Sequence, residues 1–280
     1  MTSVNSLPTK VLGGVTVPDT PLITEALEFA REHSTDSTYN HIVRSFLLGF
    51  IIADKILQDR DREAHAIAAI LHDLGFPIGH PPHSDVISPD KRFEVDGAHA
   101  ARRFLQRETD PKDWDKHRLQ LVWDAIALHT IGSVVFEKEP EVQACSYGIW
   151  ADFQGPDRVR DGLLTWDEYN AVVKVCRFLN PKQFRCILGD VACYILLHYH
   201  GRISLLTINI YWLSLLQEFP RLGLMKALKE NMCHLCETKP QTTYDNTVGE
   251  WGDRYVEGYD RKGKLTQDLL ETCTLDDIEP

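Results

Sequence analysis

The chain has 280 residues, of which 43% are hydrophobic and 25% are charged. This length allows one large domain or two small ones, and the composition is ordinary for a globular protein. The formal charge of -11 argues against a nucleic-acid partner held by a basic surface. Seven cysteines without regular spacing, and a polar N-terminal segment without a signal pattern, indicate reduced thiols and a cytoplasmic location.

Helical periodicity begins near residue 21. Asp19-Thr20-Pro21 combines a capping residue with proline at the first helical position, so a helix is expected to begin at Pro21. Apolar residues at helical spacing predict a second helix that includes residues 42–51. A third helix is expected from about Arg62 to Leu74 and to stop at Gly75.

The middle of the chain continues the helical pattern after a loop. Residues 75–90 are rich in Pro, Gly, Ser and His, which is typical of a loop. Helical periodicity returns in three places: near Asp96, at 114–129 and at 141–153. No alternating strand pattern stands out. The sequence therefore predicts one all-α domain over residues 1–280, with a flexible segment over residues 1–18.

His72-Asp73 is the most informative pair in the chain. It follows the apolar run 66–71 and precedes Leu74-Gly75. An imidazole and a carboxylate at the end of a buried helix are costly unless something satisfies both groups. A divalent metal does so, because neutral His nitrogen and Asp oxygen are standard metal ligands. This interpretation predicts a metalloenzyme.

Other ligand-type residues occupy similar positions in the sequence. His41 lies near the start of the second helix, Asp152 follows an apolar helical segment, and His129 ends the apolar run 121–128. Each residue alone has an ordinary alternative, since a single His or Asp at a helix end is often a cap or a hydrogen-bonded core residue. Four ligands from three helices can nevertheless converge in a bundle core and leave coordination positions open for water.

Four motifs in order resemble the HD-domain metalloproteins. They are Tyr39-Asn40-His41-Ile42-Val43-Arg44, Ile70-Leu71-His72-Asp73-Leu74-Gly75, Ala125-Ile126-Ala127-Leu128-His129-Thr130 and Ala151-Asp152-Phe153. Within that superfamily the chain is most similar to the cyanamide hydratases and their fungal relatives. Residues 92–98 and the segment that begins at Glu218 resemble that branch, and the similarity covers roughly residues 21–259. The resemblance implies an HD-domain helical bundle with a metal site in its core.

The resemblance also implies roles for individual residues. A single metal is expected on His41, His72, Asp73 and Asp152. Zinc is the metal expected in the hydratases, while other HD proteins use iron, manganese or another divalent ion. His129 matches the active-site His beyond the metal, and Glu94 matches an acidic residue near the pocket.

The activity implied is that of a hydro-lyase. Hydroxide at the metal would hydrate cyanamide, or a similarly small nitrile-like compound, to urea, and His129 would deliver a proton to the developing nitrogen anion. The alternative is hydrolysis of nucleotides or other phosphomonoesters, which needs converging Arg or Lys side chains. Arg44, Lys91 and Arg92 are the nearest cations in sequence, but solvated surface charge is the favoured interpretation of all three. A helical scaffold with a structural zinc is a third hypothesis.

The expected partner is a small-molecule substrate, with no nucleic acid and no membrane. A homo-oligomer remains open. Phe93, Trp150 and Phe153 lie next to motif positions and are expected either to wall a small enclosed pocket or to form plain core.

Residues 175–217 do not match their surroundings. These 43 residues carry five charged side chains, and the run 191–216 is long enough to be considered as a membrane span. His198, His200 and Arg202 are costly in lipid, so no membrane helix is expected. In the family, the segment that resembles residues 164–174 is followed directly by the segment that resembles the one beginning at Glu218. The segment is therefore a suspected insertion, and both a translated intron and a genuine helical insertion remain open.

Overall fold

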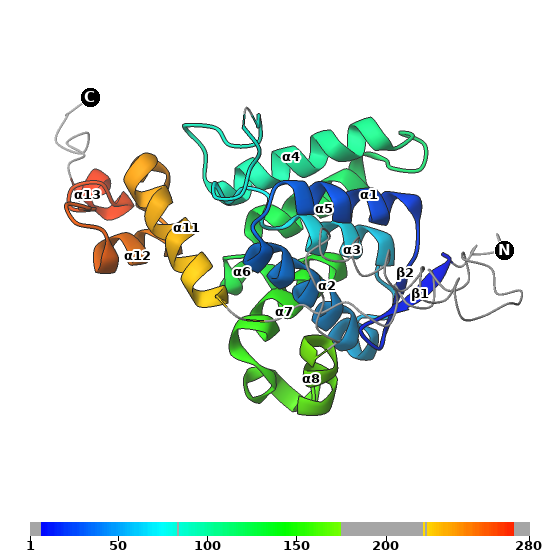
Figure 1. Ribbon diagram of the computed structural model, residues 1–280. Helices are drawn as coiled ribbons and strands as arrows, with labels where there is room; N and C mark the ends of the chain where they lie inside the picture. Colours follow the sequence, from blue (N-terminus) through cyan, green and yellow to red (C-terminus); the bar gives the residue numbers. More distant parts are fainter. Residues whose placement is uncertain (1–6, 83, 175–220, 222, 272–280) are drawn as a thin grey trace, which may run out of the picture.

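The helices of this chain form a bundle with a two-stranded sheet at one end (Figure 1). The computed structural model describes residues 7–82, 84–174, 221 and 223–271. The strands are β1 (Thr9–Leu12) and β2 (Val15–Pro18). The α-helices of the described residues are α1 (Pro21–Glu32), α2 (Asp36–Ile56), α3 (Arg62–Leu71), α4 (Phe93–Glu108), α5 (Lys116–Leu128), α6 (Gly132–Val135), α7 (Pro140–Gln154), α8 (Trp166–Lys174), α11 (Leu224–Thr238), α12 (Thr247–Tyr255) and α13 (Thr266–Glu271). The all-α fold class is confirmed. The suspected insertion, residues 175–217, lies outside the described residues.

The helix starts follow from capping residues. The Thr20 side chain accepts a hydrogen bond from the Ile23 N–H at 3.4 Å, and Pro21 occupies the first turn, so α1 begins where the sequence predicted. Asp61 caps α3 in the same way, accepting from two backbone N–H groups at 3.1 and 3.0 Å. These caps fix the directions in which α1 and α3 enter the bundle.

The helix α3 ends earlier than predicted. It stops at Leu71, and residues 72–75 form turns. The Leu74 N–H donates to the Leu71 carbonyl at 3.2 Å and the Phe76 N–H donates to the Asp73 carbonyl at 3.0 Å. These three-residue spacings are tighter than those of an α-helix. The His72-Asp73 pair is thus presented from a tight turn at the helix end.

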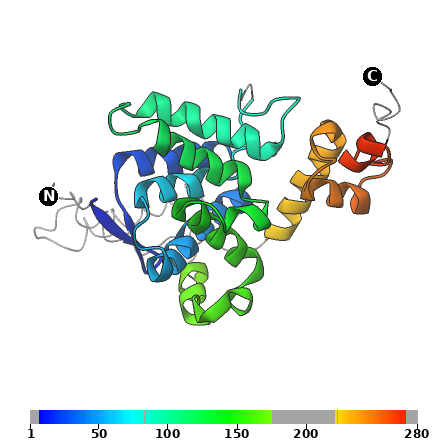
Figure 2. The ribbon, with the colours of Figure 1, turned by 180° about the vertical axis from the view of Figure 1, so that it is seen from behind.

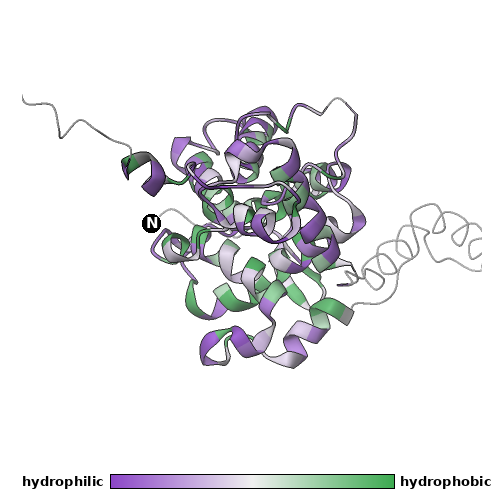
Figure 3. Ribbon diagram, turned by 90° about the vertical axis from the view of Figure 1, so that its left-hand side faces the viewer, coloured by the Kyte–Doolittle hydropathy of each residue, from purple (hydrophilic) through white to green (hydrophobic). Residues whose placement is uncertain are grey.

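The centre of the bundle is the contact between α2 and α7. Gly148 of α7 makes this contact possible, since a Cβ atom there would lie 2.0 Å from the Ser45 carbonyl oxygen of α2. Close approach of two backbones is a reason for glycine in a helix, where it otherwise weakens the helix. Hydrophobic segments gather on the inner faces of the bundle and hydrophilic ones on the outside (Figure 3). The contact places Asp152, near the end of α7, beside the first turns of α2.

The N-terminal hairpin was not predicted, since the sequence indicated no strands and a flexible segment over residues 1–18. The strands β1 and β2 pair antiparallel, with Leu12 opposite Val15. Gly13 and Gly14 form the turn with φ of 58° and 80°, which glycine adopts without steric cost. Val15 and Val17 are buried where β2 packs against α2 and α3. This burial orders residues 9–18, and the strands are too short for a clear alternating pattern.

The C-terminal helices lie at the opposite end of the bundle from the hairpin, as two views show (Figures 1 and 2). The helix α11 packs against α2 and α12. Met232, Leu235 and Cys236 of α11 form a small second core with Phe76 and Phe93. This core joins the C-terminal helices to the turn that carries His72 and Asp73.

A buried ion pair adds to that attachment. The Lys239 ammonium lies 2.7 Å from an Asp96 carboxylate oxygen and also donates to the carbonyls of Ser88 and Lys91. Both side chains of the pair are buried, and every donor of the ammonium has an acceptor. Within the described residues, no helix has both the length and the apolar character needed to cross a lipid bilayer.

Candidate metal centre

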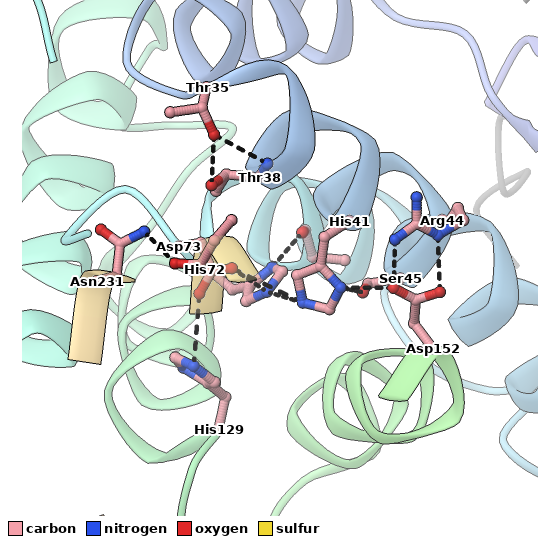
Figure 4. Close-up of polar contacts among 12 residues, drawn as sticks. Thr35, Thr38, His41, Arg44, Ser45, His72, Asp73, His129, Asp152 and Asn231 are labelled. Atoms are coloured by element: carbon pink, nitrogen blue, oxygen red, sulfur yellow. Dashed lines mark hydrogen bonds and ion pairs between the residues drawn. The ribbon is translucent and has the colours of Figure 1, made fainter. Parts of the chain in front are cut away.

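Five of the six predicted site residues come from the ends of four helices and meet in the interior. His41 lies in the second turn of α2, His72 and Asp73 follow α3, His129 caps the C-terminus of α5, and Asp152 lies near the end of α7. All five side chains are buried. Figure 4 shows His41 in the middle, with His72 and Asp73 on one side of its ring and Asp152 on the other.

Three of these residues bring their ligand atoms together. The Nε2 atoms of His72 and His41 lie 3.3 Å apart, and Asp73 Oδ2 lies 3.2 Å from His72 Nε2 and 3.7 Å from His41 Nε2. All three ligand atoms lie within 4.8 Å of one another. Two imidazole nitrogens and a carboxylate oxygen form a donor set that divalent zinc, iron and manganese accept.

The hydrogen bonds of the two imidazoles test whether a cation fits between them. His72 Nδ1 donates to the Ala69 carbonyl at 2.9 Å, and His41 Nδ1 donates to Asp152 Oδ2 at 2.6 Å. In a neutral imidazole the other nitrogen then carries a lone pair. Two lone pairs therefore face each other at 3.3 Å. A metal cation between them satisfies both, so the residues present fit a divalent metal.

The local electrostatics also favour a cation. Burial opposes charge on Asp73, but the adjacent His72 holds the pKa of the Asp73 carboxyl below its usual range. Burial lowers the pKa of His72, but the Asp73 carboxylate outweighs burial and raises that pKa overall. Burial lowers the pKa of His41 despite its hydrogen bond to Asp152. A negative charge thus stands beside imidazole nitrogens, an arrangement that attracts a positive ion.

Asp152 was predicted as a fourth ligand, and the structure does not bring it into the cluster. Its Oδ2 accepts from His41 Nδ1, the ring nitrogen that faces away from His72. Arg44 donates to the same carboxylate through Nε at 2.7 Å and Nη2 at 2.8 Å. Burial raises the pKa of Asp152, but the hydrogen bonds from His41 and Arg44 lower it to about 2. In this arrangement Asp152 fixes the tautomer and direction of His41.

Arg44 was interpreted as solvated surface charge, and that interpretation is wrong. Its side chain is fully buried and pairs with Asp152. The signal was present in the sequence, because Arg44 lies three residues after His41 within the apolar face of α2 and therefore shares its side of the helix. A buried arginine needs a carboxylate partner.

His129 lies next to Asp73 of the cluster, whereas Glu94 lies behind Thr130. The His129 Nδ1 donates to the Ile126 carbonyl at 2.7 Å, and its Nε2 lies 3.8 Å from Asp73 Oδ1. Burial lowers the pKa of His129, with a contribution from His72, so its Nε2 carries a lone pair at neutral pH. Glu94 is buried behind Thr130, from which it accepts a hydrogen bond at 2.6 Å. It also accepts from Arg92 at 3.0 Å.

A cavity of about 360 Å³ opens over the cluster, with His41, Asp73 and His129 at its floor. Phe93, Trp150 and Phe153 line this cavity, as expected if they wall a pocket rather than form plain core. Thr130 and Thr247 add two hydroxyl groups. The C-terminal helices complete the wall with apolar side chains that no sequence motif marks, namely Met225, Leu228, Met232 and Trp251. None of the described residues that line the cavity is Lys or Arg.

Comparison with protein families identifies this part of the chain. Residues 38–147 match the family model of the HD domain. This match supports an HD domain in that part of the chain. The matched range holds His41, His72, Asp73, Glu94 and His129, and it ends before Asp152. A comparison with curated proteins found no match.

The HD domain and the buried His/Asp cluster together indicate a divalent metal site and a metal-dependent enzyme. HD-domain proteins are generally enzymes, and most of them are hydrolases. The cavity wall from α11 and α12 lies outside the matched range, so that part of the site is a feature of this chain beyond its HD domain.

Proposed function

We propose that this protein is a metal-dependent hydro-lyase that adds water to a nitrile-like group, with cyanamide as the simplest substrate and urea as its product. The observation that carries the proposal is the chemistry of the cavity. A buried metal-binding cluster forms its floor, and apolar side chains without a described Lys or Arg form its walls. Such a cavity suits an uncharged substrate, because a buried anion requires charged donors.

Phosphomonoester hydrolysis is the alternative function, because most HD-domain proteins are hydrolases. The three cations nearest to the site motifs in sequence each have a carboxylate partner, and Arg221 lies 3.9 Å from Asp152 Oδ1. Arg44 binds Asp152 on the far side of His41, Arg92 binds Glu94, and Lys91 lies at the surface beside Asp90. Because these cations are already paired with carboxylates, an uncharged substrate is favoured over a phosphate ester.

The residues around the cavity supply what hydration needs. When bound, a divalent metal lowers the pKa of a water molecule, so that hydroxide is accessible near neutral pH. The substrate carbon gains the oxygen of water while one π bond of the C≡N group breaks. His129 accepts a proton from the attacking water on its Nε2 and returns it to the nitrogen. Tautomerisation then gives the urea, and no group leaves.

The surrounding side chains control water and orientation. Phe93, Trp150 and Phe153 exclude bulk water from the floor, which strengthens the electrostatic interactions there. His41, His72 and Asp73 hold the metal, and Asp152 with Arg44 holds His41. Glu94 acts through Thr130 rather than by contact with the cavity.

A direct comparison of substrates tests the proposal. Metal-loaded protein is assayed for urea release from cyanamide and, in parallel, for phosphate release from a panel of nucleotides and other phosphomonoesters. We expect urea release only. Turnover of phosphomonoesters with none of cyanamide would replace the proposal by its alternative.

The variant His129→Ala separates catalysis from metal binding. We expect turnover to fall by about 10²- to 10⁴-fold, the usual contribution of a general acid–base, while metal content stays at the wild-type value. Equal loss of metal and activity would make His129 a ligand instead.

A further inference from the structure

The cavity over the metal cluster is larger than cyanamide requires. Its volume is about 360 Å³, whereas a molecule of three heavy atoms displaces about as much space as two waters, roughly 60 Å³. With cyanamide alone at the floor, most of the cavity would hold water against apolar walls, which is unfavourable. A ligand with a larger body would remove that water.

The cavity wall formed by the C-terminal helices indicates the chemistry of that body. Met225, Leu228 and Met232 of α11 and Trp251 of α12 line this side. Unbranched thioether side chains adapt to apolar groups of different shape, and an indole offers a large flat contact surface. Among the described lining residues there is no Lys or Arg to hold an anion, and Asp73, a member of the metal cluster, is the one carboxylate, so the lining suits an uncharged group.

Thr130 adds a polar requirement at the edge of the floor. Its hydroxyl donates to a Glu94 carboxylate oxygen at 2.6 Å, and that carboxylate also accepts from Arg92. Because an ionised carboxylate only accepts hydrogen bonds, the Thr130 proton points away from the cavity. The lone pairs of Thr130 are then left for a donor in the cavity it lines. A substrate with an N–H group beside the reacting carbon supplies such a donor.

We propose that the natural substrate is a monosubstituted cyanamide, R–NH–C≡N, whose R is an uncharged alkyl or aryl group packed against α11 and α12. The inference rests on the proposed hydration activity. Water adds across the C≡N bond to give R–NH–CO–NH2: its oxygen bonds to carbon, and both of its hydrogens finish on the terminal nitrogen. No oxidant, reductant or leaving group is required. Cyanamide is then a small and weakly held representative.

Binding of product analogues tests the apolar wall without relying on turnover. Isothermal titration of the metal-loaded protein compares urea, propylurea and benzylurea. We expect affinity to rise about fourfold for each added methylene that becomes buried, so benzylurea should bind at least about 100-fold more tightly than urea. Equal affinities across the series would overturn the inference.

Two substitutions on α11 locate the effect. Leu228→Trp fills the cavity and should remove most of the advantage of benzylurea over urea. Lys226→Trp introduces the same side chain at an exposed position of the same helix, where the side chain is 79% exposed, and should leave the advantage intact. If Lys226→Trp loses the stronger binding of benzylurea over urea while Leu228→Trp keeps it, the assignment of the binding wall to the cavity side of α11 is contradicted. If Leu228→Trp does not fold, the affinities of the wild-type protein for urea, propylurea and benzylurea decide whether the apolar wall binds the R group.

Removing the Thr130 hydroxyl tests the N–H requirement. In the isosteric variant Thr130→Val we expect benzylurea to bind about tenfold more weakly, as for one lost hydrogen bond, while a compound of similar size without an N–H, N,N-dimethylbenzamide, is unaffected. Equal weakening of both ligands would remove this part of the inference.

Turnover then separates the two proposals. Hydration of cyanamide without binding or turnover of benzylcyanamide would leave the proposed function standing and overturn this inference. Tight binding of benzylurea without turnover of any cyanamide would overturn the proposed function and the substrate inference with it, and would leave only the apolar binding site on α11 and α12.

Discussion

Replacement of Arg44 by methionine is expected to destabilise the metal-free protein strongly. Arg44 and Asp152 are both fully buried, and two charge-assisted hydrogen bonds of 2.7 and 2.8 Å join them. Methionine keeps much of the side-chain volume but leaves the buried Asp152 carboxylate with one hydrogen-bond partner, His41, and a longer ion pair to Arg221 at 3.9 Å. Removing one member of a buried ion pair typically costs about 3–5 kcal/mol.

The lowered pKa of Asp152 indicates a stabilisation of similar magnitude. Its value of about 2 lies below the ordinary value of 3.8, which corresponds to about 2 kcal/mol of stability at neutral pH from its hydrogen bonds together. Because this pKa is depressed in the fold, the contribution is present above about pH 4 and is lost as the pH falls through about 2. We therefore expect Arg44→Met to lower the free energy of unfolding by about 3 kcal/mol at pH 7.

Urea denaturation of the metal-free proteins measures this change. The matched control is Arg31→Met, since Arg31 pairs with Asp36 at the surface, where such a pair contributes less than about 1 kcal/mol. The double variant Arg44→Met, Asp152→Leu should recover part of the stability, because it leaves no unpaired buried charge. A loss in Arg44→Met no larger than in the control would refute the buried pair.

Three further predictions follow from the same contacts. Asp152→Asn should lower metal affinity by about 10- to 100-fold, as for a group that orients a ligand, and complete loss of metal in elemental analysis would show that Asp152 binds the metal itself rather than through His41. Gly148→Ala should cost about 1–3 kcal/mol in thermal or urea unfolding, because its Cβ would meet a backbone carbonyl of α2 at 2.0 Å, whereas Gly132→Ala, with its nearest atom at 4.0 Å, should be close to neutral. Deletion of residues 175–217 should preserve soluble expression and metal content, since loop-closure entropy changes slowly with length; loss of folding would show that the segment is a required structural element.

Local signals in the sequence account for the features that were predicted correctly. The capping residue and proline at Thr20-Pro21 determine the start of α1 through local contacts, independently of residues distant in the sequence. His72 and Asp73 are adjacent, so one tight turn is sufficient to present both. The apolar context of His41 and His129 marked them as buried polar groups. In each case a few neighbouring residues determine the outcome.

Features that depend on tertiary contacts were missed. The helical spacing from His41 indicated the inward face of Arg44, but its partner is a carboxylate more than a hundred residues away in the sequence, so the pair itself was not predicted. The hairpin is ordered by burial of Val15 and Val17 against α2 and α3 rather than by strand length. The cavity wall from Leu228 and Trp251 arises only when α11 and α12 dock on the HD domain, and no motif marks these residues.

Reconstitution of metal-stripped protein tests whether hydration depends on a metal in the His41, His72 and Asp73 cluster. The cluster of His41, His72 and Asp73 is the group of described residues whose geometry fits a divalent metal. Chelator-treated protein is titrated with Zn²⁺, and the rate of urea formation from cyanamide is followed at each addition. We expect no hydration by the stripped protein and a linear recovery that ends at one equivalent of metal. Full hydration by protein shown to be metal-free would contradict this dependence.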